Sequence, residues 1–248
     1  MINNIVNSKF FAGLTATVAF TGVMANAGVA NAQSVTFTDT FELAPTDITD
    51  ALLSIEKFDD QDGRFDLLGV TVGFDGQIVG NASVESLDAQ AQTLTFSLSG
   101  LLKLLEPTDS LNNPLFEETV SASDSFDATA FDGSVDFGGT SGQAFSGLTA
   151  TLSGENFYDD QGILDFFTGD GDVNFLFSAN TNSNVTGAAN IASIISTQAG
   201  AGVRVTYEYE EFTGDVKSEK VPEPSAILGL GLFAGAGILS KKKLTKKA

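Results

Sequence analysis

Hydrophobic and polar residues alternate one by one over several short segments of this chain. The clearest case is Leu94, Phe96 and Leu98, which are separated by a threonine and a serine. The same period of two recurs in segments 35–43, 70–74, 173–177 and 203–210. Because successive side chains of a β-strand point to opposite faces, this period predicts strands with one buried face.

Clusters of aspartate and glycine separate these segments. They lie at 59–63, 75–76, 132–133, 138–139 and 168–172. Both residue types favour turns, glycine because it tolerates positive φ and aspartate because its side chain bonds to the nearby backbone. Many short strands joined by such turns are typical of an antiparallel β-sandwich, so we predict an all-β fold with a single folded domain.

Two segments depart from the strand pattern. Residues 48–58 predict a short helix, with Asp47 as the cap of its first turn. Its apolar residues are Leu52, Leu53 and Ile55. Residues 101–105 are a second helical candidate, with the alternative that they prolong the preceding strand.

Residues 1–32 have the organisation of a secretory signal peptide. A polar start is followed by an apolar segment, and Ala30 and Ala32 fit the small-x-small pattern of a cleavage site. We predict cleavage between Ala32 and Gln33, with residues 25–27 as a second candidate site. The mature chain would then begin at Gln33.

The other end of the chain, residues 221–248, combines a rigid break, a short apolar stretch and a basic tail. Val221, Pro222, Glu223 and Pro224 come first, residues 226–239 are apolar, and residues 240–248 hold five lysines. As a helix the apolar stretch is about 21 Å long, short of the roughly 30 Å of a bilayer's hydrocarbon core. Lysines after a marginal span predict a cytoplasmic tail, which places the rest of the chain outside.

This order, Val-Pro-Glu-Pro at 221–224 and then an apolar helix and a basic end, resembles the PEP-CTERM sorting signal of bacterial surface proteins. The resemblance implies an exported protein that an exosortase-type membrane enzyme recognises and processes. Its partners would be the export machinery and that enzyme, and residues 226–239 would hold it in the membrane before processing. The alternative is a single-pass anchor that is never cut.

Residues 33–220 form the predicted extracellular body. They hold six of the twelve basic residues and thirty-one of the thirty-two acidic ones, a net charge of −25. So negative a field repels nucleic acid, which we exclude as a partner. The chain has no cysteine, so this body depends on its hydrophobic core rather than on disulfides.

Parts of the body resemble the extracellular domain family called choice-of-anchor, type E. Residues 53–59 and 67–72 are similar to the opening of that domain, and residues 167–173 and 203–209 to its closing half. An insertion, residues 60–66, separates the two parts of the opening motif. The resemblance implies an exported domain carried on varied anchors, and it implies no reaction.

Composition also argues against an enzyme. The chain has no histidine and no cysteine, which removes the common Ser-His, Cys-His and zinc sites. A glycoside hydrolase acting through paired carboxylates is a remote alternative, because no spacing singles out two of the many acids. We therefore predict no catalytic residues.

The acidic turns are the candidates for metal chemistry, because calcium prefers oxygen ligands. The candidate ligands are Asp59, Asp60, Asp62, Asp66, Asp170 and Asp172, and Asp159 and Asp160 form a similar pair. None of these turns matches an EF-hand loop. We favour ordinary turns and predict no cofactor, with weak calcium binding as the alternative.

The function that follows is a non-enzymatic protein of the cell surface or extracellular matrix, with extracellular polysaccharide as a candidate partner. The alternative is a surface module that binds a glycan or another protein. Its stacking residues would be Tyr158, Tyr207 and Tyr209, the three tyrosines of the chain.

Overall fold

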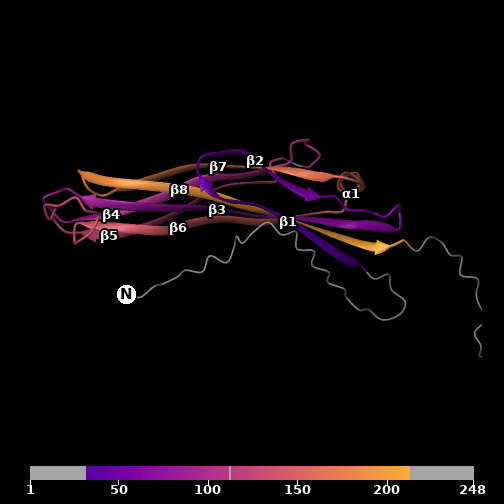
Figure 1. The fold of residues 1–248 in the computed structure, drawn as a ribbon, viewed down its shortest axis with the longest axis horizontal. Helices are drawn as coiled ribbons and strands as arrows, with labels where there is room; N and C mark the ends of the chain where they lie inside the picture. The colour runs from indigo at the N-terminus through magenta and orange to yellow at the C-terminus, as the bar shows by residue number, and fades with distance from the viewer. Residues whose placement is uncertain (1–31, 112, 213–248) are drawn as a thin grey trace, which may run out of the picture. The chain divides into compact units, whose positions relative to one another are not determined.

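The computed structural model describes residues 32–111 and 113–212. In this part of the chain it contains eight strands and one short helix (Figure 1). The elements are β1 (Gln33–Pro45), β2 (Ile48–Glu56), β3 (Phe65–Ser86), β4 (Gln92–Leu105), β5 (Phe116–Ala128), β6 (Gly142–Tyr158), α1 (Gln161–Phe167), β7 (Asp172–Thr186) and β8 (Ile191–Glu211).

The strands form two antiparallel sheets of four strands each, which pack as a β-sandwich. One sheet has the order β1-β8-β3-β6 and the other has the order β2-β7-β4-β5. The predicted fold class, an antiparallel β-sandwich, is confirmed at this level. The chain changes sheet several times, so strands that are neighbours in a sheet are often far apart in sequence.

The two central strands of the first sheet, β3 and β8, are longer than the alternating segments of the sequence predicted. β3 has 22 residues and β8 has 21, and they pair without interruption from Gly69 and Glu208 to Ser86 and Ile191. The predicted turn at Asp75 and Gly76 is therefore wrong. Both residues lie inside β3 and pair with β6 and β8, and these ladders on both sides outweigh the local turn preference.

The predicted helix at 48–58 is also wrong, because residues 48–56 form the edge strand β2, paired with β7. Leu53 and Ile55 are buried whereas Leu52 is 59% exposed, which is the period of a strand. Residues 101–105 prolong β4, as the alternative interpretation proposed.

The core fills the space between the sheets. Its larger cluster includes Phe74, Phe175, Phe177 and Tyr207, all fully buried. A smaller cluster around Phe96 packs separately. Phenylalanine supplies much of this core, which is how a chain without disulfides stabilises the sandwich.

The helix α1 was not predicted. Asp160 caps it by accepting a hydrogen bond from the Gly162 amide at 2.9 Å. The acidic pair at 159–160 thus contributes a helix cap. Leu164 and Phe167 bury the inner side of this short helix.

The predicted sorting segments lie mostly outside the described residues. These are the signal peptide up to residue 31, including Ala30, and the whole of residues 221–248, including Val221, Pro222, Glu223 and Pro224. Among residues 32–111 and 113–212, no helix is both long and apolar enough to cross a bilayer. Gln33, the predicted mature N-terminus, is the first residue of β1.

Candidate functional site

The structure brings the two predicted acidic turns together at one end of the sandwich. The β2–β3 connection and the loop after α1 are joined by main-chain hydrogen bonds. The Phe58 amide donates to the Phe167 carbonyl at 2.8 Å, and the Gly169 amide donates to the Phe58 carbonyl at 2.9 Å. A further bond joins Lys57 to Gly171 at 2.9 Å. Turns that are about a hundred residues apart in sequence therefore form one surface.

The candidate calcium ligands have different local surroundings on that surface. Asp59 accepts a hydrogen bond from the Gln61 amide at 2.8 Å, which shapes the turn. Asp66 and Asp172 lie on β3 and β7, and Asp172 pairs with Glu56. Within the described residues no three acidic, histidine or cysteine side chains gather as a metal site. Weak calcium binding by Asp59, Asp60, Asp62, Asp66, Asp170 and Asp172 stays the untested alternative to ordinary turns.

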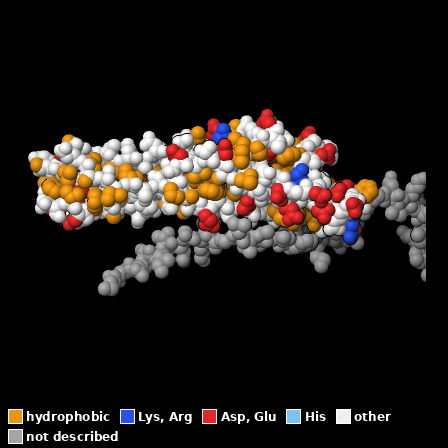
Figure 2. Space-filling view, turned by 45° about the horizontal axis from the view of Figure 1, so that its top comes forward, with side chains coloured by type: hydrophobic (Ala, Val, Ile, Leu, Met, Phe, Trp, Pro, Cys, Tyr) orange, Lys and Arg blue, Asp and Glu red, His pale blue; other side chains and the backbone are white. Residues whose placement is uncertain are grey.

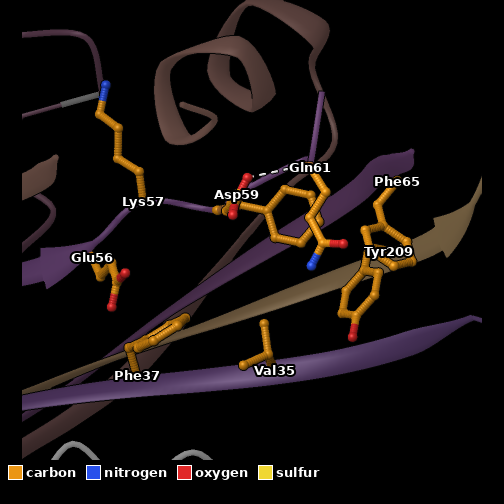
Figure 3. Close-up of a pocket in the computed structure, with 9 residues that line it drawn as sticks. Val35, Phe37, Glu56, Lys57, Asp59, Gln61, Phe65 and Tyr209 are labelled. Atoms are coloured by element: carbon orange, nitrogen blue, oxygen red, sulfur yellow. Dashed lines mark hydrogen bonds between the residues drawn. The ribbon is translucent and has the colours of Figure 1, made fainter. Parts of the chain in front are cut away.

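A pocket of about 150 Å³ opens beside these turns (Figure 3). It lies between the edge strand β1 and the β2–β3 connection, and the end of β8 closes one side. Its lining residues are Val35, Phe37, Glu56, Lys57, Phe58, Asp59, Gln61, Phe65 and Tyr209. The pocket thus combines residues from four segments of the chain.

Aromatic rings form the walls of the pocket. The Tyr209 ring lies 5.1 Å from that of Phe58 and 5.4 Å from that of Phe65, centroid to centroid. Phe37 faces the pocket from β1 and contacts Tyr207 behind it, with centroids 5.9 Å apart. Tilted and edge-on pairs of this kind stabilise one another beyond their burial and hold the cavity open.

The rim of the pocket is polar and carries negative charge. Glu56, Asp59 and Gln61 are exposed at its mouth. Lys57 also lines the pocket, but its side chain points away from the rings in Figure 3 and its ammonium lies 5.3 Å from the centre of the Phe166 ring. Two carboxylates therefore dominate the electrostatics of the opening.

Arg64 is the other positive charge near this pocket, and it too has partners. Its guanidinium lies 5.2 Å from the Phe65 ring centre and forms an ion pair with Glu211 at 3.2 Å. Figure 2 shows acidic side chains gathered over this end of the sandwich, with hydrophobic and uncharged groups prevailing on the visible face of the other half.

Tyr207 lies behind the pocket and connects the two sheets. Its hydroxyl donates a hydrogen bond to the Glu56 carbonyl at 2.8 Å. Burial raises the pKa of this phenol well above its ordinary value, and the negative charges of Glu56 and Asp172 raise it further. The raised pKa of Tyr207 therefore reflects its burial and the negative charges beside the pocket.

The structure changes the role of the three tyrosines that sequence analysis offered as stacking platforms. Tyr207 is fully buried and Tyr209 is only 6% exposed, so neither presents an open ring face to a sugar. Tyr158 is partly buried at the end of β6, and burial raises the pKa of its hydroxyl. Sequence analysis missed the rings of Phe58 and Phe65, which contact Tyr209, and that of Phe37, which lines the same pocket.

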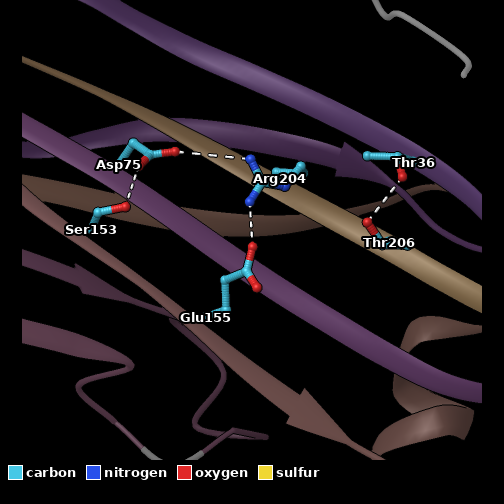
Figure 4. Close-up of polar contacts among 6 residues, drawn as sticks. All are labelled: Thr36, Asp75, Ser153, Glu155, Arg204 and Thr206. Carbon is cyan, nitrogen blue, oxygen red and sulfur yellow. Dashed lines mark hydrogen bonds and ion pairs between the residues drawn. The ribbon is translucent and has the colours of Figure 1, made fainter.

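A second polar cluster lies on the outer face of the β1-β8-β3-β6 sheet (Figure 4). Arg204 of β8 forms ion pairs with Asp75 of β3 and Glu155 of β6. Gly73 makes room for it, because a Cβ there would lie 3.0 Å from the guanidinium. This cluster ties three strands together across an exposed face and encloses no cavity, so we assign it to stability.

Comparison with known proteins gives no family. No protein-family model and no curated protein matches the chain. Among solved structures, one that matches is described as the structure of infectious bursal disease virus, Gx strain, with 9% identity and a TM-score of 0.16. The match covers 88% of this chain and 53% of that one, so the chain spans about half its length. A TM-score this low does not establish a common fold.

Proposed function

We propose that this protein is a non-enzymatic component of the cell surface or extracellular matrix, exported and then sorted by an exosortase-type enzyme. The observation that carries the proposal is the order of segments at residues 221–248: a Val-Pro-Glu-Pro motif, an apolar stretch and a basic end. Among the described residues, the first strand begins at Gln33 and the last strand ends at Glu211. The resemblance to choice-of-anchor domains agrees with this proposal.

The arrangement of these two strands suits removal of both end segments. Gln33 pairs with Tyr209 in the sheet, so the strands enter and leave the sandwich at the same end. Among the residues that the structure describes, these ladders begin at Gln33 and end at Glu211. Cleavage at 32–33 and near 222–224 would therefore leave every described strand pair intact.

The motif itself provides the test. A variant with Pro222, Glu223 and Pro224 all replaced by alanine is compared with the wild type in the bacterium that makes it, with Glu219→Ala as the matched control. We expect the wild type and the control on the surface or in the medium. The triple variant should remain in the membrane with its lysine tail. Identical distribution of all three proteins would overturn the proposal.

The pocket favours a second candidate function, that of a surface module that binds a ligand. It offers an enclosed apolar wall and a polar rim, the usual composition of a small-molecule site. A pocket of about 150 Å³ can hold one small group of a ligand. Screening of the full-length protein against glycans, with none bound, would remove the glycan form of this candidate.

A further inference from the structure

We propose that the pocket beside β1 binds a small organic cation, an alkylated ammonium group of about the size of choline. Two independent features of the pocket carry the proposal. The half-buried rings of Phe37 and Phe65 line it together with the nearly buried Phe58 and Tyr209, and two of its lining residues are the exposed acids Glu56 and Asp59. This goes beyond the proposed surface function and does not depend on processing of the tail.

Ring faces and carboxylates favour the same kind of ligand. The face of an aromatic ring carries partial negative charge, so a cation held against it is attracted electrostatically. Glu56 and Asp59 add full negative charges at the opening, and the nearby Lys57 and Arg64 already contact other groups. Lys57 is held over Phe166, and Arg64 is paired with Glu211 and lies over Phe65, so a ligand cation would be attracted mainly by Phe37 and by the two carboxylates.

The chemistry of the walls selects an organic cation over a metal ion. Calcium requires six to eight oxygen ligands, whereas these walls are formed by Val35 and aromatic rings. An alkylated ammonium has apolar methyl groups that gain from burial against such rings while its charge remains. The same walls disfavour a sugar, whose hydroxyls would find partners only at the rim.

The volume of the pocket suits a small ligand group. A cavity of about 150 Å³ is large enough for one small organic molecule, such as a trimethylammonium group with a short substituent. The high negative charge of the body would also raise the local concentration of any cation.

The test is a calorimetric titration of the full-length protein with choline and with 3,3-dimethylbutanol, its neutral isostere. We expect saturable choline binding, with the neutral compound at least about tenfold weaker. Asp59→Asn and Glu56→Gln should each weaken choline binding about threefold to tenfold. The control Asp60→Asn, on the same turn but outside the pocket lining, should change it less than about twofold.

Phe65→Leu provides a second variant that keeps every charge. We expect this variant to bind choline more weakly than the wild type. Circular dichroism and the melting temperature serve as the control that the variant is folded. If choline binds, titration with glycerophosphocholine, a soluble lipid headgroup, separates the two ligand sources. Tighter binding of glycerophosphocholine than of choline assigns the headgroup of a lipid, and weaker binding assigns a free soluble cation; both support an ammonium site.

Three results would overturn the proposal. Equal binding of choline and its neutral isostere would make the pocket a simple apolar cavity. If Asp59→Asn and Asp60→Asn weakened choline binding equally, the attraction would come from the general surface charge and not from the pocket. If the folded wild type did not bind choline, or bound glucose more tightly than choline, the pocket would not be a cation site.

Discussion

Tyr207 shows how one side chain joins the two sheets of this protein. It stands on the central strand β8, and its hydroxyl reaches the main chain of the edge strand β2 at Glu56. The ring itself contacts Phe37, Phe58 and Phe167. The wall of the pocket and the core of the sandwich therefore depend on the same residue.

Tyr207→Phe should lower the free energy of unfolding by about 1–2 kcal/mol at neutral pH, because the Glu56 carbonyl loses its partner. The raised pKa of Tyr207 also makes stability depend on pH. Above the ordinary value of 10.0 the unfolded chain loses the phenol proton while the folded protein keeps it, so wild-type stability falls as pH rises. Urea unfolding at pH 7 and above pH 10 measures both effects.

Tyr207→Phe lacks the ionising phenol, so its free energy of unfolding should fall less steeply above pH 10 than that of the wild type. Parallel curves for the two proteins would contradict the role given to Tyr207. Tyr158, whose pKa burial also raises, is present in both proteins and cancels in the comparison.

Gly187 lies where the fold leaves no room for a side chain. It joins β7 to β8 with φ +119°, and a Cβ there would lie 1.9 Å from the Thr93 carbonyl oxygen. Gly133 has a similar φ of +100° and open space around it. Gly187→Ala should therefore cost at least about 3 kcal/mol of stability, and Gly133→Ala about 1 kcal/mol. Equal losses in thermal unfolding would refute the close approach of the loop to β4.

At the scale of elements, β2 is the strand that most clearly departs from its sequence prediction. The cluster Leu52, Leu53 and Ile55 is compatible with both a helix and a strand, and local sequence did not resolve the two. Pairing with β7 and burial against the core decide in favour of the strand. Tertiary contacts thus override a weak helical preference.

Leu52 and Leu53 are neighbours in β2 that differ in burial, so their alanine variants can be compared directly. Leu53→Ala should lower the free energy of unfolding by about 2–5 kcal/mol, because Leu53 is buried in the core. Leu52→Ala should change it by less than about 0.5 kcal/mol, because Leu52 faces solvent. Chemical denaturation of both variants measures this. Similar losses at the two positions would contradict the strand orientation.

The sequence predicted the β class and the short alternating strands, because burial of one sheet face imposes a period of two. It did not predict that 75–76 continue a strand, since only pairing on both sides overcomes an Asp-Gly turn signal. It named Tyr209 and acids near the pocket but missed the rings of Phe37, Phe58 and Phe65. Phe37 and Tyr209 line one pocket only because distant strands pair, and alternation within one segment carries no information about that pairing.

At the scale of the molecule, the acidic surface and the pocket lie at the same end of the sandwich. β1 begins there, β8 ends there, and the pocket opens beside both. A net charge of −25 over residues 33–220 opposes close association of copies of this domain unless cations screen it.

Intact mass spectrometry of the protein recovered from the envelope and medium of its own bacterium tests the central claim most directly. The account predicts a chain that starts at Gln33 and ends near Pro222–Pro224, with any excess mass due to a group attached after sorting. A mass that retains residues 241–248 would contradict sorting at the Val-Pro-Glu-Pro motif and leave a protein with a permanent C-terminal anchor.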